Sequence, residues 1–113
     1  MKFIILDVDY DAPKELDTQI PFKITLIKQM PGEDRSDYWL AKTNKSIKWQ
    51  EENCEINYVV VSSRYVGTTI DSKIKKIILG LAYVIDESLL DDSTLNMGKC
   101  KYVAICEANR TLF

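Results

Sequence analysis

The sequence contains no histidine. Histidine is the usual general base near neutral pH and the commonest metal ligand in proteins, so every catalytic triad built on imidazole is excluded. A reaction catalysed by this chain would have to use carboxylates, lysine, tyrosine or a cysteine that has no histidine partner. A glycine-rich phosphate-binding loop is also missing. These absences predict that the protein is not an enzyme.

Cysteines are few, and their spacing matches neither a disulfide pattern nor a zinc-binding pattern. Cys54, Cys100 and Cys106 are odd in number, and no two of them form a Cys-x-x-Cys pair, so neither a set of disulfides nor a zinc site is indicated. If Cys100 and Cys106 lie on one strand, they are about 20 Å apart and cannot bond to each other. We expect reduced thiols that pack as small hydrophobic side chains, and no metal or other cofactor.

The apolar runs are too short to span a membrane, and the charge does not favour binding to nucleic acid. The longest run without charge covers residues 77–85, about half the length of a membrane-spanning helix, and the first apolar segment stops at Asp7. With 15 basic and 17 acidic side chains the net charge is −2. The chain therefore has no general attraction for phosphate backbones. We expect a cytoplasmic protein without a signal peptide or membrane partner, and we regard nucleic acid as an unlikely partner.

The apolar run at 77–85 is the stretch around which the fold is expected to form, in a single domain covering residues 1–113. A run of this length should be covered on both faces, as a central strand or a buried helix. Apolar residues at three-and-four spacing across 74–89 fit a helix. However, lysines before the run and acids after it oppose the helix dipole, and Gly80 and several β-branched residues disfavour a helix. The strand is favoured, and the helix remains open.

Alternation of apolar and polar residues predicts the other strands, and these lie at 3–10, from 21 to the turn at 30–34, and at 38–43, 47–49, 56–66 and 99–106. Residues 44–46 are expected to form the tight turn of a hairpin. The segment before Gln19 is a loop or one helical turn, and the loop 86–98 can hold one turn at Leu89 and Leu90. Six or seven strands with at most one or two short helices predict a mainly β, antiparallel domain, folded as a barrel, sandwich or prism.

Three aspartates end the first predicted strand, and Asp7, Asp9 and Asp11 are expected on one face of it. An apolar strand ending in Asp-x-Asp resembles the opening motif of haloacid-dehalogenase-type phosphotransferases, which implies Asp7 as nucleophile and Asp9 as acid and base. Asp11 stands where that family has Thr or Val, and the family's larger doubly wound sheet is missing. The same strand is similar to the N-terminal strand of archaeal family B DNA polymerases. Clustered carboxylates can also bind a divalent cation, so a carboxylate-based, metal-dependent enzyme is one alternative function.

Aromatic and cationic residues alternate over the predicted hairpin, where Tyr38, Trp39 and Trp49 are interleaved with lysines at 42, 45 and 48. Aromatic rings beside cations can stack on the bases of a single strand, so a β-barrel that binds single-stranded nucleic acid is a second alternative. Exposed tryptophan and tyrosine also anchor protein interfaces. Packing across the hairpin is the commonest role of such residues. We include the three aromatic residues among the candidates for partner binding.

A second group of acids occupies the loop 86–98 and consists of Asp86, Glu87, Asp91 and Asp92. Together with the N-terminal aspartates they are candidates for binding a basic partner. In size, acidity and β-rich build, the chain resembles the small acidic immunity proteins that bacteria keep in the cytosol against secreted nuclease toxins. This resemblance rests on general character and not on a motif. It implies a basic protein partner, such as a nuclease toxin, whose active site is covered and whose association is steered by charge.

Overall fold

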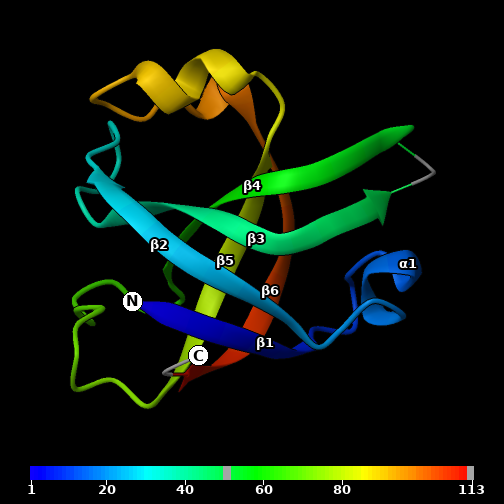
Figure 1. The fold of residues 1–113 in the computed structure, drawn as a ribbon. Helices are drawn as coiled ribbons and strands as arrows, with labels where there is room; N and C mark the ends of the chain where they lie inside the picture. Colours follow the sequence, from blue (N-terminus) through cyan, green and yellow to red (C-terminus); the bar gives the residue numbers. More distant parts are fainter. Residues whose placement is uncertain (50–51, 112–113) are drawn as a thin grey trace.

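The chain folds as a closed antiparallel barrel of six strands that follow one another in sequence order (Figure 1). The computed structural model describes residues 1–49 and 52–111. The last strand pairs with the first, so the sheet has no unpaired edge. This confirms the predicted mainly β, antiparallel class and selects the barrel. The strands are β1 (Lys2–Val8), β2 (Phe22–Met30), β3 (Tyr38–Trp49), β4 (Cys54–Ser63), β5 (Lys76–Val84) and β6 (Cys100–Thr111).

The apolar run forms β5, which pairs with β4 on one side and β6 on the other. The strand interpretation is therefore confirmed. The expectation that both faces are covered is wrong, because Ile78 is 42% exposed and Ile85, just beyond the strand, is 55% exposed. Alternate residues of β5 enter the barrel, and the others lie on its outer wall, part of which meets solvent.

The barrel interior is one apolar core, and a short helix covers one end of it. Helix α1 (Lys14–Asp17) is the predicted single turn before Gln19, and its Leu16 is buried in the same core. The side-chain amide of Gln19 donates to the backbone oxygen of Lys48 and accepts from its N–H, both at 2.7 Å. The amide thus ties the α1 segment to β3 as a neighbouring strand would. None of the helices in the described ranges is long and apolar enough to cross a bilayer.

A second core lies outside the barrel, beneath the segment between β5 and β6. This segment, which we call the strap (residues 85–99), crosses the top of the molecule in Figure 1 and contains two 3-10 helices, η1 (Glu87–Asp91) and η2 (Met97–Lys99). Leu89 and Leu95 of the strap are buried against the outer wall of the barrel. The helical turn at Leu89 and Leu90 is confirmed, whereas η2 was not predicted. The residues of this second core are Met30, Tyr38, Leu40, Val60, Ala82, Leu89, Leu95 and Cys100.

The predicted hairpin at residues 44–46 is wrong, because β3 is one continuous strand. Its pairing with β4 shifts between Lys42, opposite Tyr58, and Ile47, opposite Ile56. Five steps along β3 thus match two along β4, which leaves three extra residues in a wide bulge. The bulge is tied to β4 by Thr43, whose Oγ1 donates to the backbone oxygens of residues 56 and 57 at 3.3 and 3.2 Å. A polar run that looks like a turn is here an outward bulge.

Three strand ends also differ from the prediction. β1 stops at Val8, and β4 stops at Ser63 because the chain turns away at residues 64–67, where Gly67 has a φ of +96°. β6 continues past Cys106 to Thr111, since its pairing with β1 and β5 continues to that end of the barrel. This extension adds Glu107 to the ordered outer wall.

Candidate functional site

A bulge in β1 sets the direction of the N-terminal aspartates. Ile5 pairs with Ala108 of β6, but Asp7 pairs with Glu107, so Leu6 is one extra residue on β1. Asp7 and Glu107 are consequently neighbours on the exposed outer wall. The prediction that Asp7, Asp9 and Asp11 share one strand face is wrong, because the bulge and the end of β1 at Val8 interrupt the alternation.

The backbone of β6 holds the second aspartate in place. The N–H of Asp9 donates to the backbone oxygen of Ile105 at 2.9 Å, and Asp9 Oδ1 accepts from the N–H of Ile105 at 3.3 Å. Asp7 Oδ1 accepts from the N–H of Val8 at 2.9 Å. Within residues 1–49 and 52–111, neither aspartate forms an ion pair, and neither does Glu107. Their charge is therefore available to a partner.

Asp7, Asp9 and Glu107 are among the residues that line a mostly apolar hollow. The hollow has a volume of about 170 Å³ and lies on the outer wall of β1, β6 and β5, where its lining residues are Asp7, Val8, Asp9, Ile78, Ile105, Cys106 and Glu107. Tyr102, also on β6, is 57% exposed, and Gly80 opposite Ile105 adds no side chain to the wall. We call Asp7, Asp9, Asp11, Ile78, Tyr102, Ile105 and Glu107 the acidic face.

The charges of the face act on the groups beside it. Burial raises the pKa of the Tyr102 hydroxyl, and the negative charge of Asp9 adds to this effect. Burial, followed by the charges of Asp9 and Asp7, raises the pKa of the Cys106 thiol to about 12. Because the thiolate is the nucleophilic form, Cys106, which is buried in the barrel core behind the hollow, is a neutral, unreactive thiol near neutral pH. The face therefore offers negative charge and apolar surface, and its cysteine is not an activated nucleophile.

The aspartates do not form a metal-binding set. Among the described residues, no group of three or more Asp, Glu, Cys or His side chains is arranged to hold a metal ion. Asp7 lies on the outer wall, Asp9 is bound to β6, and Asp11 lies in the following turn. The arrangement thus provides no shared coordination site of the kind a hard cation requires.

Two of the three aromatic candidates, Tyr38 and Trp49, are buried, which corrects their assignment as interface anchors, while the role of Trp39 in binding stays a prediction. Tyr38 is 8% exposed and packs in the second core, where its hydroxyl donates to Asp34 Oδ2 at 2.7 Å. Trp49 is also 8% exposed and packs edge-on against Tyr83 in the barrel, with ring centroids 5.3 Å apart. Trp39 is half-buried against the same core. A continuous β3 separates the rings between two cores, whereas a hairpin would have placed them together.

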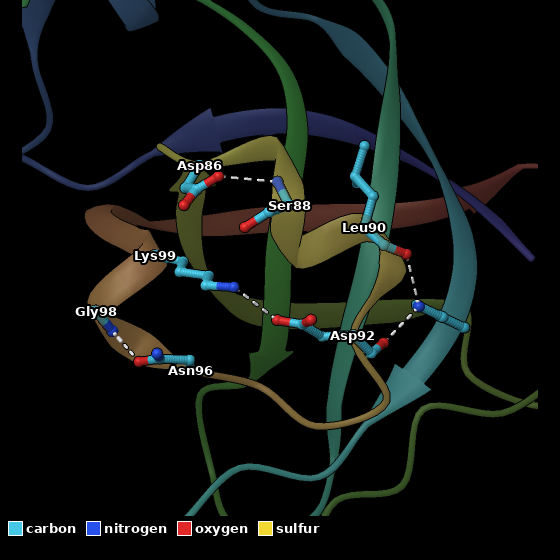
Figure 2. A network of polar contacts seen from close by, with 8 residues as sticks. Asp86, Ser88, Leu90, Asp92, Asn96, Gly98 and Lys99 are labelled. Atoms are coloured by element: carbon cyan, nitrogen blue, oxygen red, sulfur yellow. Dashed lines mark hydrogen bonds and ion pairs between the residues drawn. The ribbon is translucent and has the colours of Figure 1, made fainter.

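Two of the four acids in the strap hold the strap itself in place (Figure 2). Asp86 Oδ1 accepts from the N–H of Ser88 at 2.9 Å, which lowers the pKa of Asp86. Asp92 Oδ2 lies 2.9 Å from Lys99 Nζ. These contacts stabilise the strap and do not exclude a partner, so the assignment of Asp86 and Asp92 to partner binding stays a prediction. Glu87 and Asp91 are exposed, and their role in binding stays a prediction.

A lysine from β2 fixes the strap to the barrel. Lys28 Nζ donates to the backbone oxygens of Leu90 at 2.8 Å and Asp92 at 2.7 Å, at the end of η1. The N–H of Leu95 donates to the backbone oxygen of Pro31 at 2.9 Å. These bonds satisfy backbone groups that a short helix leaves open, and they hold Leu89 over the second core.

Glu107, Ile78, Ile105 and Tyr102 belong to the acidic face, although the sequence did not single them out. No local signal identifies them, because the face is assembled by the pairing of β1 with β6 from opposite ends of the chain. The alternation of β6 beyond Cys106 would have placed Glu107 outward, but the strand was predicted to end at Cys106.

The geometry of the acidic face can be set beside known proteins. The face combines unpaired carboxylates with exposed apolar side chains on a closed barrel. Comparisons of the chain with protein-family models, with curated proteins and with solved structures found no match.

Proposed function

We propose that the protein is a non-catalytic binding module that captures a basic protein partner on its acidic face. The observation that carries the proposal is the mostly apolar hollow of about 170 Å³ whose lining includes Asp7, Asp9 and Glu107. These carboxylates form no ion pair within the described residues, so a cationic partner can neutralise them.

The hollow has the chemistry that a lysine or arginine side chain requires. The methylene groups of such a side chain pack on Ile78 and Ile105, while its charged head reaches the carboxylates of the lining. The volume suits one side chain of this kind. Exposed Tyr102 and Ile78 add the apolar contacts that contribute most to affinity, and the surrounding acids steer the approach of the partner.

The closed barrel suits a binder that acts by covering its target. Since β1 and β6 close the sheet, a partner cannot extend it by adding a strand and must be recognised through side chains. Side chains on paired strands keep fixed positions, which lowers the entropy lost on binding. These properties fit an immunity-type inhibitor whose acids take the place of phosphate groups in the active site of a nuclease toxin.

The test is the affinity for a basic protein captured from the source organism, measured by isothermal titration calorimetry. The double variant Asp7→Asn, Glu107→Gln removes two charges from the acidic face. The matched control Glu33→Gln, Glu55→Gln removes two charges from exposed positions that lie outside the acidic face and the strap. We expect the face variant to bind roughly a hundredfold more weakly, since each lost charge-assisted contact weakens binding about tenfold. The control should bind within about threefold of the unmodified protein, because exposed charges away from an interface contribute little.

Two results would contradict the proposal. One is an equal loss of affinity in both double variants, which would mean that the hollow has no special role in binding the partner. The other is an affinity that does not change with salt concentration, because attraction between exposed charges is screened by added ions.

A further inference from the structure

A second hollow, with the opposite charge, lies where β5 begins and β6 ends. It measures about 500 Å³, and its lining residues are Ser72, Lys75, Lys76, Asn109 and Arg110. In Figure 1 this end of the barrel is at the bottom, where the red end of β6 lies beside the start of β5 near the label C. Lys76 pairs with Asn109, and the N–H of Arg110 donates to the backbone oxygen of Lys75 at 2.8 Å. The cations of two strands are therefore neighbours in space.

Within residues 1–49 and 52–111, the cations of this basic hollow form no ion pair. The ion pairs of the described residues involve Arg35, Lys99 and Lys101, and none involves Lys75, Lys76 or Arg110. The chain has 17 acidic side chains, and Asp71 directly precedes Ser72 of the hollow. The carboxylate of Asp71 accepts a hydrogen bond from the backbone N–H of Lys73 at 2.8 Å. Adjacent like charges repel each other, so an anion bound between them would stabilise this arrangement.

Asn109, in the wall of the basic hollow, has a side-chain acceptor that the described residues leave unused. Its side-chain oxygen is buried without a hydrogen-bond partner in the part of the chain that the structure describes. An amide oxygen accepts hydrogen bonds, so this buried atom requires a donor such as a water molecule and does not itself indicate an anion. The cations that line the hollow, and not Asn109, are the groups that an anion would bind.

We infer that the basic hollow binds the phosphate group of a small phosphorylated molecule. The guanidinium of Arg110 can donate to two phosphate oxygens at once, and Lys75 and Lys76 add point charges beside it. The hollow of about 500 Å³ exceeds the size of a phosphate ion and falls within the range of small-molecule sites. A nucleic acid fits less well. Its long phosphate backbone would extend past Glu107, two residues before Asn109 on β6, and would be repelled by this carboxylate and by the net charge of −2. This site does not depend on the acidic face.

The probes are inorganic phosphate and adenosine monophosphate, titrated into the full chain at constant ionic strength. Backbone amide chemical shifts report where they bind, and calorimetry reports the affinity. We expect shifts confined to residues 72–76 and 108–111. The double variant Lys75→Gln, Lys76→Gln should bind at least about tenfold more weakly, since each charge-assisted hydrogen bond contributes about that factor. The matched control Lys42→Gln, Lys45→Gln on β3 should bind as the unmodified protein does.

A further variant, Arg110→Lys, keeps the charge but loses the two-pronged geometry and should also bind more weakly. Thermal melting of every variant confirms that it is folded. The proposal is overturned by the absence of shifts at millimolar probe, or by equal losses in the two lysine variants. It is also overturned by tighter binding of a single-stranded oligonucleotide or of anionic lipid vesicles than of either probe, since the hollow would then belong to a surface for a polyanion.

Discussion

The strap and the acidic face are both rich in carboxylates, but they use them differently. In the strap, Asp92 pairs with Lys99, so this charge stabilises the segment that carries it. On the acidic face, Asp7 and Glu107 stand side by side without an ion pair in the described residues. Acidic residues that look equivalent in a sequence are thus divided by their neighbours into structural charges and available charges.

The apolar residues of the two regions differ in the same way. Leu89 of the strap is fully buried in the second core, whereas Ile78 and Tyr102 of the acidic face are exposed. A change in the strap should therefore lower the free energy of unfolding, and a change on the face should lower affinity for a partner while leaving the fold intact.

The largest expected effect on stability is that of Leu89→Ala. Removing a fully buried leucine leaves a cavity, and we expect a loss of about 2–5 kcal/mol in the free energy of unfolding. The matched change Ile78→Ala on the exposed wall should cost roughly 1 kcal/mol or less. Urea denaturation of both variants measures the difference. Equal losses would mean that the strap does not cover a core.

Removal of the Lys28 amine should have the next largest effect. In Lys28→Met the backbone oxygens of Leu90 and Asp92 lose their donor, and we expect a loss of about 1–3 kcal/mol. Hydrogen exchange should increase in the strap more than in β5 and β6. Lys42→Met, which changes an exposed lysine on β3, is the control. A uniform increase across the barrel would contradict a specific role of Lys28 in holding the strap.

Thiol labelling distinguishes opening of the strap from unfolding of the barrel. Burial raises the pKa of Cys100 in the second core to about 11, while Cys106 lies in the barrel interior with a pKa of about 12. Near neutral pH we expect half-buried Cys54 to react first, then Cys100, and Cys106 last. Lys28→Met should increase the labelling rate of Cys100 about tenfold and that of Cys106 less, since local opening exposes only the second core. Mass spectrometry of the labelled peptides gives the order, and simultaneous labelling of Cys100 and Cys106 would contradict it.

The smallest effect concerns pH. The hydrogen bond from the Ser88 N–H lowers the pKa of Asp86 in the folded protein relative to the unfolded chain. Its contribution to stability is therefore present above the unfolded pKa of about 3.9 and is lost as the pH falls through the folded value. In Asp86→Asn the side chain still accepts the bond but does not titrate, so stability should fall less steeply in acid. Thermal melts across the acid range measure this slope, and an unchanged slope would contradict the role of Asp86.

The sequence predicted those parts of the fold that depend on local patterns. Alternation located β1, β2, β4 and the start of β6, and the charges at both ends of the run at 77–85 correctly favoured a strand over a helix. The bulges at Leu6 and at residues 43–46 were missed, because a bulge exists only relative to the strand that pairs with it. The role of the strap was missed for the same reason, since the residues of the core that contains Leu89 come from β2, β3, β4, β5 and β6.

The candidate site was predicted in part. Asp7 and Asp9 were identified as candidates, but their neighbour Glu107 and most of the apolar lining come from strands that lie at the other end of the sequence. The assignment of Tyr38 and Trp49 was wrong because one error, a hairpin in place of a continuous strand, moved them onto a common surface that does not exist. Binding of a basic partner stays a prediction.

The bulge of β3 is a suitable site for labelling or immobilising the protein. In a ring of six strands, β3 is three places from β6 in either direction, so residues 44–46 project from the wall opposite the strand that carries Glu107 and Asn109. A dye or a biotin joined to a cysteine at position 45, or a short peptide tag inserted there, would immobilise the molecule with both of its charged hollows facing the solution.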